Sequence, residues 1–423
     1  MTTPALLSVY LDDEHVGTLY PTSPLAFEYD AAWLAHSHAR AIDVTIPLQT
    51  GKIDSACVYT FFENLLPEGD QRQIISLRHQ VTSVFGLLAA VGGDTAGAVV
   101  LVPFGERPQA AHYRPTTWEQ LQSQTAHVDA DADNAEEGTD TSSSRRLSLS
   151  GAQFKMLVSI DDYGMPLLPL GNSPSTHIIK PDIVRSDLKI FASAINETVV
   201  MRTALYCGLP TASVHYVPSL HACAVKRYDR ELTESGRLIR IAQADFCQLA
   251  GKPSEVKYEV DGGPGFVECF QLISHYSVMP AVDQRNLLKW LFFNLYTGNN
   301  DSHAKNLALL HTRSGLRLAP FYDLMCTRLY AGLGRHFAFQ IGGEYEPGNL
   351  HGSHFETLAS ELGIRFDYLK KIADELAKIL PAALDKAGLE LGQDLTSSER
   401  TLIERLKQKT NSLTKQINTK LNA

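Results

Sequence analysis

The chain has 423 residues, of which 44% are hydrophobic and 20% are charged, and its formal net charge is −9. This length fits two or three domains, and the balance of apolar and charged residues is typical of a folded globular protein. The negative charge argues against a protein that binds nucleic acid over its whole surface, while a local basic patch remains compatible with it.

Nothing in the sequence predicts export or membrane insertion. The N-terminal residues have no basic region followed by an apolar core, so no signal peptide is expected. The longest apolar stretch, residues 84–104, contains Asp94 and four glycines and predicts a helix, a turn and a strand rather than a membrane span. The six cysteines form no CxxC pair, so we expect reduced thiols in a cytoplasmic protein without a membrane partner.

The first part of the chain predicts a compact α+β domain over residues 1–110. Residues 5–21 alternate apolar and polar side chains around a turn-rich centre, which predicts a β-hairpin. A further strand, a helix broken at its Pro-Glu-Gly turn and a buried strand are expected at residues 26–34, 58–79 and 96–104. An acidic, serine-rich linker is expected next, over residues 111–146, because residues 127–146 carry six acids and almost no apolar side chain.

Residues 147–235 predict a small sheet-rich part with one helix. The helix is expected within residues 189–210, where Phe191, Ile195, Val199 and Ala204 share one face and Gly208 ends the pattern. The strands around it are expected within residues 145–171, 175–182 and 212–230.

Residues 236–423 predict a large helical part. Three helices are expected before a hairpin, at residues 244–251, 264–277 and 282–298. The last helix opens with a capping box formed by Thr396 and Glu399. Its apolar stripe is expected to face the core or a partner helix and consists of Leu402, Leu406, Leu413 and Ile417.

Three polar residues in the helical part follow an order that phosphoryl transfer uses. Asn306 follows Asp301 by five residues, residues 307–320 predict two strands, and Asp323 comes just after the second strand. Since a hairpin returns the chain, Asp323 is expected to face Asp301 and Asn306. In kinases one Asp accepts or orients the hydroxyl proton, while an Asn and a second Asp hold Mg²⁺ against the ATP phosphates.

Two other interpretations of this segment stay open. Asp301, His303 and Asp323 could hold the metal ion of a hydrolase, although a zinc site usually takes more nitrogen or sulfur ligands. The segment from Asp301 to Asn306 could also be an ordinary polar loop or helix start with capping side chains.

A kinase also needs a cation on the phosphates and a loop over them. Lys180 ends a predicted strand, and the small residues within 148–155 could bring backbone N–H groups close to phosphate. Glu197, on the following helix, could pair with Lys180 or could be an ordinary carboxylate of the helix surface.

Several short motifs occur in the order found in the HipA family. They are "SLSGAQFK", "THIIKP", "VKRYDR", "SEVKYEVDGGPG", "NNDSHAKN" and "APFYDL", and "ENLLPEGDQR" resembles the N-terminal domain of that family. The resemblance covers roughly residues 5–390, and the motifs are specific when taken together. It implies an α+β, two-lobed protein-kinase-like fold with a large helical C-terminal lobe, and a bacterial serine/threonine kinase that acts as the toxin of a toxin–antitoxin pair.

The resemblance also implies residue roles. Asp301 resembles the catalytic Asp, Asn306 and Asp323 resemble the Mg²⁺ ligands, and Lys180 resembles the phosphate lysine. The nucleotide contacts that it implies come from the loop over ATP, the hinge and the catalytic segment: Ser150, Gly151, Ala152, Gln153, Phe154, Lys155, Lys180, Lys226, Arg227, Tyr228, His303, Ala304, Lys305, Asn306, Tyr322 and Asp323.

The family's regulatory autophosphorylation serine aligns with Ser148, and Ser150 is a second candidate acceptor two residues on. A phosphate on this loop would repel the ATP phosphates, and Arg145 and Arg146 could hold it. The family phosphorylates an aminoacyl-tRNA synthetase, which stalls translation and induces dormancy and persistence. A helix-turn-helix antitoxin of the HipB type would neutralise the toxin and bring it to operator DNA. A catalytically silent HipA-like co-repressor is the alternative that stays open.

Overall fold

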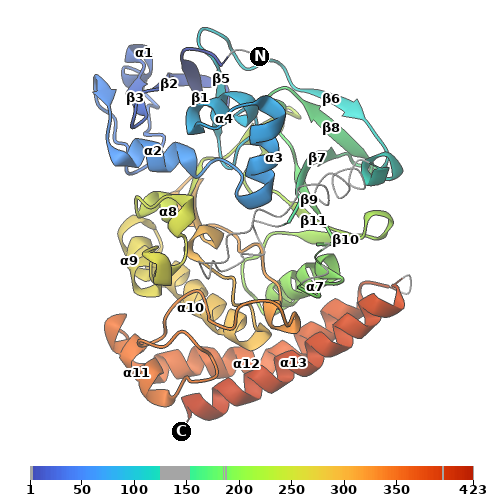
Figure 1. Ribbon diagram of the computed structural model, residues 1–423. Coiled ribbons are helices and arrows are strands. Elements are labelled where there is room, and N and C mark those ends of the chain that lie inside the picture. Colours follow the sequence, from blue (N-terminus) through green and yellow to red (C-terminus); the bar gives the residue numbers. More distant parts are fainter. Residues whose placement is uncertain (1–2, 124–152, 184, 186–187, 393–394, 423) are drawn as a thin grey trace, which may run out of the picture.

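The computed structural model describes residues 3–123, 153–183, 185, 188–392 and 395–422, which form three packed parts (Figure 1). The N-terminal domain is an antiparallel five-stranded sheet in the order β4-β3-β2-β1-β5, with helices over one face. Its elements are β1 (Leu7–Leu11), β2 (Glu14–Tyr20), β3 (Ala26–Tyr29), α1 (Ala31–Leu34), β4 (Lys52–Ile53), α2 (Ala56–Glu63), α3 (Gly69–His79), α4 (Val84–Val91) and β5 (Val99–Pro103).

The sheet-rich lobe is built on a six-stranded antiparallel sheet in the order β10-β11-β9-β7-β8-β6. The element α7 (Ser193–Tyr206) lies against this sheet and packs on α12 and α13 of the next part, so it joins the two lobes. The strands are β6 (His112–Pro115), β7 (Met156–Ile160), β8 (Pro166–Leu170), β9 (His177–Pro181), β10 (Val214–Val217) and β11 (Ala222–Lys226). The short turn η1 (Pro218–Leu220) joins β10 to β11, and the small ribbon β12 (Arg230–Leu232) and β13 (Leu238–Arg240) follows β11.

The helical lobe contains most of the largest apolar core and a three-stranded sheet in the order β14-β15-β16. Its strands are β14 (Gln243–Asp245), β15 (Ala308–Thr312) and β16 (Gly315–Leu318). Its helices are α8 (Phe246–Leu249), α9 (Phe266–Tyr276), α10 (Pro280–Thr297), α11 (Gly352–Glu361), α12 (Phe366–Leu389) and α13 (Ser397–Leu421), with short turns η2 (Ser254–Val256), η3 (Glu259–Asp261), η4 (Ala304–Asn306) and η5 (Thr327–Leu329).

Most predicted elements are confirmed. The hairpin β1–β2, the helix pair α2 and α3 on either side of Pro67, and the hairpin β15–β16 are all present. The capping box of α13 forms, because the Thr396 hydroxyl accepts from the N–H of Glu399 while the Glu399 carboxylate accepts from the N–H of Thr396. The predicted stripe on α13 is buried against α10 and α12.

Three predicted elements need correction. Residues 26–34 are only half strand, because Asp30 accepts a hydrogen bond from the N–H of Ala32 at 2.8 Å and caps the helix α1. The helix α7 begins at Ser193, so Phe191 precedes it, whereas Ile195, Val199 and Ala204 are fully buried as expected. The segment expected to be a linker, residues 111–146, begins with β6, a mostly exposed edge strand whose polar composition gives no strand signal.

The membrane prediction concerned residues 84–104, which form α4 and the buried strand β5. Within the described residues, no single helix has the length and apolar character to cross a membrane, and α3 and α4 meet that test only as a pair bent by 83°.

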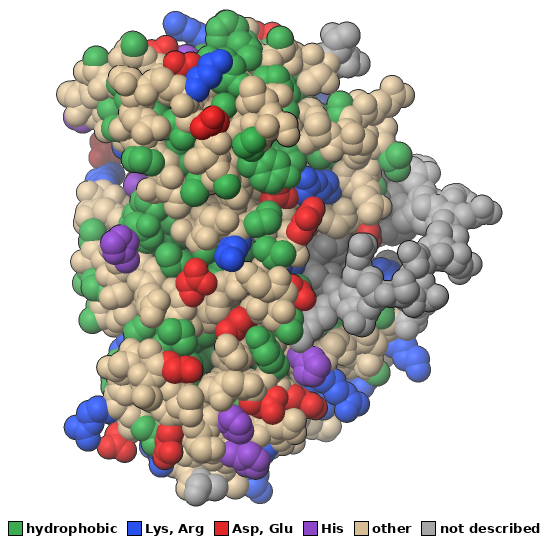
Figure 2. All heavy atoms as spheres, turned by 60° about the vertical axis from the view of Figure 1, so that its left-hand side comes forward, with side chains coloured by type: hydrophobic (Ala, Val, Ile, Leu, Met, Phe, Trp, Pro, Cys, Tyr) green, Lys and Arg blue, Asp and Glu red, His purple; other side chains and the backbone are tan. Residues whose placement is uncertain are grey.

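The surface in Figure 2 mixes charges of both signs. Acidic, basic and hydrophobic side chains are interspersed across this face of the N-terminal domain and the helical lobe. This distribution agrees with the sequence argument against a whole-surface nucleic-acid binder.

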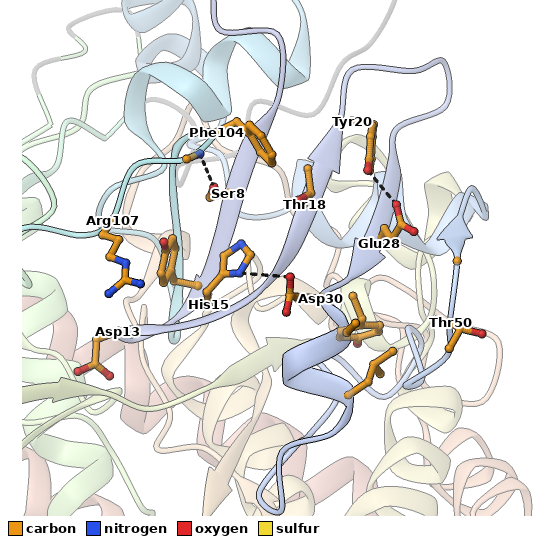
Figure 3. Close-up of a pocket in the computed structure, with 16 residues that line it drawn as sticks. Ser8, Asp13, His15, Thr18, Tyr20, Glu28, Asp30, Thr50, Phe104 and Arg107 are labelled. Atoms are coloured by element: carbon orange, nitrogen blue, oxygen red, sulfur yellow. Dashed lines mark hydrogen bonds and ion pairs between the residues drawn. The ribbon is translucent and has the colours of Figure 1, made fainter.

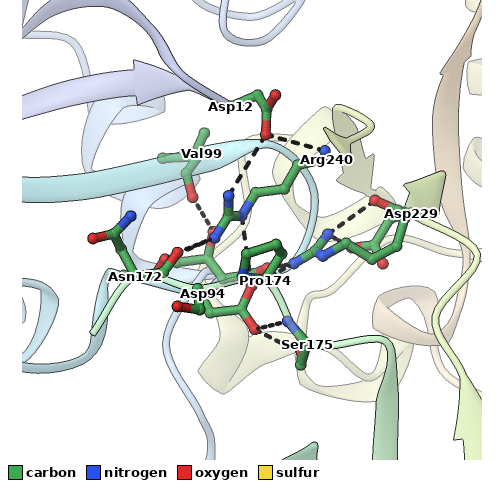
Figure 4. A network of polar contacts seen from close by, with 12 residues as sticks. Asp12, Asp94, Val99, Asn172, Pro174, Ser175, Asp229 and Arg240 are labelled. Atoms are coloured by element: carbon green, nitrogen blue, oxygen red, sulfur yellow. Dashed lines mark hydrogen bonds and ion pairs between the residues drawn. The ribbon is translucent and has the colours of Figure 1, made fainter. Parts of the chain in front are cut away.

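A buried network of ion pairs joins the N-terminal domain to the sheet-rich lobe (Figure 4). The Asp94 carboxylate, with a side chain 8% exposed, lies 2.7 Å from the Arg230 guanidinium and 3.3 Å from that of Arg227. Asp229 binds the same two arginines at 2.8 and 3.0 Å, and Arg240 lies 3.6 Å from Asp94. Because three guanidinium groups share two buried carboxylates, each carboxylate is needed to offset their desolvation.

Asp94→Ala is therefore expected to destabilise the protein by about 3–5 kcal/mol, since it leaves buried guanidinium charge without its partner. The measurement is the free energy of unfolding in urea. Asp13→Ala is the matched control, because Asp13 and its partner Arg237 have side chains 57% and 51% exposed, and its cost should stay below about 1 kcal/mol. Equal effects of the two substitutions would contradict this account of the network.

Candidate active site

A three-way ion cluster around Lys180 lies where the two lobes meet. Lys180 is on β9, in the middle of the six-stranded sheet, and is 5% exposed. Its Nζ lies 2.6 Å from Oε1 of Glu197 on α7 and 2.7 Å from Oδ1 of Asp323, which follows β16. The predicted pairing of Lys180 with Glu197 is present, and Glu197 is fully buried rather than on a helix surface.

Burial and the ion pairs shift the pKa of each member of the cluster. Burial opposes the charge of Lys180, but Asp323 and Glu197 outweigh it and raise the pKa of Lys180 above its ordinary value. Burial likewise opposes ionisation of Asp323, and Lys180 outweighs it and lowers the pKa of Asp323. For Glu197 burial dominates and raises the pKa, and its Oε2 has no hydrogen-bond partner.

The backbone brings Asp323 to this cluster in a strained conformation. Phe321 bridges to the sheet-rich lobe, since its N–H donates to the carbonyl of Pro210 at 2.7 Å and its carbonyl accepts from Ala212 at 2.9 Å. Asp323 then adopts a φ of +56°, a left-handed conformation that is uncommon outside glycine. Such strain persists where the surroundings hold it, and it clusters at functional sites.

The turn that carries Asp301 begins where α10 ends. Gly298 ends the helix with a φ of +75°, and the N–H of Asn300 donates to the Thr327 hydroxyl at 2.9 Å. The side-chain amide of Asn306 donates to the backbone carbonyl of Asp301 at 3.0 Å. The hairpin β15–β16 then leads from Asn306 back to Asp323, as the sequence predicts.

His303 and Lys305 are both buried beside this turn. His303 is 1% exposed, neither ring nitrogen has a hydrogen-bond partner, and burial holds its pKa well below the ordinary value. The ammonium of Lys305 donates to the carbonyl and side-chain oxygen of Asn64 at 2.9 and 2.8 Å and to Asp245 at 3.0 Å. Lys305 therefore ties this turn to the N-terminal domain.

A cavity of about 420 Å³ opens in front of these groups, which is within the range for small-molecule sites. Seven of the predicted site residues line it: Lys155, Lys180, Arg227, Lys305, Asn306, Tyr322 and Asp323. The N-terminal domain supplies a wall that the site prediction missed, from Asn64, Leu65, Leu66, Pro67, Glu68, Gln71 and Asp94 among others. The available signal was the "ENLLPEGDQR" motif, which places charged residues around a helix break.

The remaining predicted residues that the structure describes, Asp301 and His303 among them, are not part of this lining. Gln153 is buried with an unpartnered Nε2, Phe154 is half-buried, and Ala304 is buried beneath the turn. Ser148, Ser150, Gly151 and Ala152 lie outside the described residues.

Two backbone N–H groups of the predicted hinge, Lys226 to Tyr228, already donate hydrogen bonds within the protein. The N–H of Lys226 donates to Ser213 at 2.8 Å and that of Arg227 to Thr176 at 2.9 Å. The Lys226 side chain is exposed, and the ring of Tyr228 packs against that of Tyr322 with centroids 5.8 Å apart.

A larger cavity, of about 840 Å³, lies on the open face of the N-terminal sheet (Figure 3). Tyr20 donates to Glu28 there at 2.8 Å, and His15 lies 3.9 Å from Asp30. It shares no lining residue with the cavity beside Lys180. Although this cavity is larger, it therefore contains none of the predicted active-site residues.

Among the described residues, no group of three His, Cys, Asp or Glu side chains could hold a metal ion. The described residues therefore do not supply the group of metal ligands that the hydrolase interpretation needs. A site for Mg²⁺ at Asn306 and Asp323 would use an amide oxygen and one carboxylate, and its other ligands would come from phosphate and water.

Comparisons with known proteins agree with this arrangement. The family model described as the HipA-like C-terminal domain matches residues 147–384, and the HipA N-terminal domain matches residues 7–102. The chain is 33% identical to the protein Y4mE of Sinorhizobium fredii over 397 residues, covering 90% of this chain and 92% of the relative. It is 28% identical to the serine/threonine-protein kinase toxin HipA of Shewanella oneidensis over 404 residues, covering 91% and 90%.

A solved structure has the same fold over its whole length. It is the Shewanella oneidensis toxin–antitoxin complex of HipA, HipB and operator DNA, with a TM-score of 0.83 and 25% identity over 99% of both chains. The fold and the site together define a two-lobed protein of the protein-kinase-like class. Within that class, the chain belongs to the HipA family.

Glu68 links the N-terminal domain to the site, and its ion pairs predict that the stability of the protein depends on pH. Burial alone would raise its pKa, but Lys257 and Lys305 lower it to about 2. A carboxylate with a lowered folded-state pKa stabilises the protein above its unfolded value of about 4.5, and that stability is lost as the pH falls toward 2.

The stability difference between the wild type and Glu68→Gln should therefore be largest near neutral pH. It should fall by about 1 kcal/mol between pH 6 and pH 4 and by about 2 kcal/mol by pH 3, as measured by urea unfolding. Glu356→Gln on the exposed face of α11 is the control and should change stability by less than about 0.5 kcal/mol. A Glu68→Gln difference that stays constant with pH would contradict the assignment.

Proposed function

We propose that the chain is a HipA-like serine/threonine kinase that transfers the γ-phosphate of ATP to a cellular protein. The observation that carries the proposal is the position of Lys180, bonded to Glu197 at 2.6 Å and Asp323 at 2.7 Å. Kinases use a strand lysine paired with a helix glutamate on the phosphates, and a metal-binding Asp after a hairpin. Kinship with a serine/threonine-protein kinase toxin supports the same assignment.

The residues present fit ATP and Mg²⁺. Both ring nitrogens of the buried His303, one oxygen of Glu197 and the amide of Gln153 have no partner in the described structure, and buried polar groups without partners are costly unless a ligand or water meets them. Asn306 and Asp323 would hold the metal ion. When bound, Mg²⁺ neutralises charge on the phosphates.

Each catalytic side chain has a separate task in this proposal. Lys180 orients the phosphates and offsets their charge. Asp301 accepts or orients the proton of the acceptor hydroxyl, and the hydrogen bond from Asn306 to its backbone carbonyl keeps the turn in place. Lys155, on the cavity wall, adds a second positive charge near Asp323.

The cellular role that we propose follows the family. The acceptor is a serine or threonine of an aminoacyl-tRNA synthetase, so the kinase would inhibit translation as a cytoplasmic toxin and induce persistence. The Shewanella oneidensis HipA structure contains HipB and operator DNA. We therefore propose a HipB-type antitoxin as partner, with operator DNA bound mainly through it.

A catalytically silent co-repressor, acting only through the antitoxin, is the alternative. The presence of Lys180, Asn306 and Asp323 around one cavity supports the kinase instead, with Asp301 held beside them by the hydrogen bond from Asn306 to its backbone carbonyl.

The first test is transfer of label from γ-labelled ATP to the chain itself. Asp301→Asn should reduce transfer by about 100-fold or more, because it removes the group that takes the proton, while the melting temperature stays within about 2 °C of the wild type. Asp161→Asn, in the turn between β7 and β8, is the control and should transfer label normally. Wild-type protein that transfers no label would sink the kinase proposal.

The second test identifies the autophosphorylated serine. Ser148→Ala should remove most of the label from the chain, whereas Ser150→Ala should leave most of it, as measured by peptide mapping of the labelled protein. A phosphate adds about −1.5 to −2 charges to the loop, so labelled protein should also bind ATP more weakly. Loss of label in Ser150→Ala alone would mean that Ser150, and not Ser148, is the autophosphorylated serine.

A further inference from the structure

Tyr258 is a buried tyrosine whose hydroxyl reaches the Asp301 carboxylate. It lies between η2 and η3, is 7% exposed, and donates its O–H to Oδ1 of Asp301. Its ring also makes a T-shaped contact with the ring of His303, with centroids 5.1 Å apart and an interplanar angle of 87°. One side chain therefore contacts two residues of the catalytic turn.

The segment that carries Tyr258 is held from the N-terminal domain. Glu63 accepts from the N–H and the hydroxyl of Ser254 at 2.9 and 2.7 Å, and Glu68 pairs with the buried ammonium of Lys257. The backbone is also tightly folded, because a Cβ on Gly263 would lie 2.0 Å from the carbonyl oxygen of Val256. Tyr258 is thus placed by contacts on both sides rather than by a mobile loop.

We propose that Tyr258 is a positioning residue for Asp301, which orients this carboxylate for the acceptor hydroxyl. The inference rests on the proposed kinase function. A hydrogen bond to an ionised carboxylate is among the stronger kinds, and a bond on one oxygen restricts rotation of the group. The correct orientation of a catalytic group contributes a large factor to the reaction rate, because a small displacement of that group slows the reaction strongly.

A purely structural role of Tyr258 predicts a different effect of its substitution. A tyrosine that only fills the core would, when changed to Phe, lower stability and leave the chemical step unchanged. A positioning tyrosine acts through Asp301, so its loss should lower the rate constant of transfer without changing nucleotide binding. The two roles also differ in a double-mutant cycle, since residues that act as a unit are not additive.

The experiment compares wild type, Tyr258→Phe, Asp301→Asn and the double variant in label transfer from γ-labelled ATP with Mg²⁺. Tyr258→Phe should lower kcat by about 10- to 100-fold and change the KM for ATP by less than about 2-fold. In the Asp301→Asn background the same change should have less than about a 2-fold effect. If Asp301→Asn leaves too little transfer to measure, Asp301→Glu replaces it as the background.

Tyr29→Phe is the matched control, because Tyr29 is also buried, and its hydroxyl donates to Ile46 at 2.5 Å and accepts from Ile42 at 3.0 Å, away from the site. It should lose stability and keep kcat. An unchanged kcat in Tyr258→Phe, or an equal loss in both Asp301 backgrounds, overturns the inference. Wild-type protein without transfer overturns the proposed function instead, so the two failures are distinguishable.

Discussion

The buried ammonium of Lys180 is the group on which the rest of the site depends. It lies between a carboxylate of α7 and a carboxylate that follows β16, so it fixes the sheet-rich lobe and the helical lobe relative to each other. Removing such a charge from water is costly, and only close, hydrogen-bonded carboxylates offset that cost. The same ion pairs hold Asp323 at the cavity that Asn306 also lines.

The N-terminal domain is an integral part of this site. Asn64 holds Lys305, Glu68 pairs with Lys257, and Asp94 belongs to the buried network around Arg227. Because the loss of one partner of a buried ion pair destabilises a protein, the three parts of the chain are expected to depend on one another for stability. The domain also lines the cavity with side chains, so it forms part of the proposed site itself.

Much of the fold could be predicted from the sequence, because periodicity and capping are local signals. The capping box at Thr396 and the strands on either side of Asn306 and Asp323 are examples. Edge strand β6 could not, since its mostly polar residues give no strand signal and it pairs with β8 far along the chain. The short helix α1 is a different case, because its cap at Asp30 is a local signal that lies within an apolar run.

The site shows the same division. Asp301, Asn306 and Asp323 can be proposed from their spacing in the sequence, whereas Tyr258 and Glu68 meet the residues of the proposed site only through tertiary contacts. The most direct test of the account is the intact mass of the purified wild-type chain after incubation with ATP and Mg²⁺. A gain of phosphoryl groups that requires Mg²⁺ and is absent in Lys180→Met is the predicted result. An unchanged mass in wild-type protein whose melting temperature rises with ATP would mean that the site binds the nucleotide without transferring phosphate, which contradicts the account.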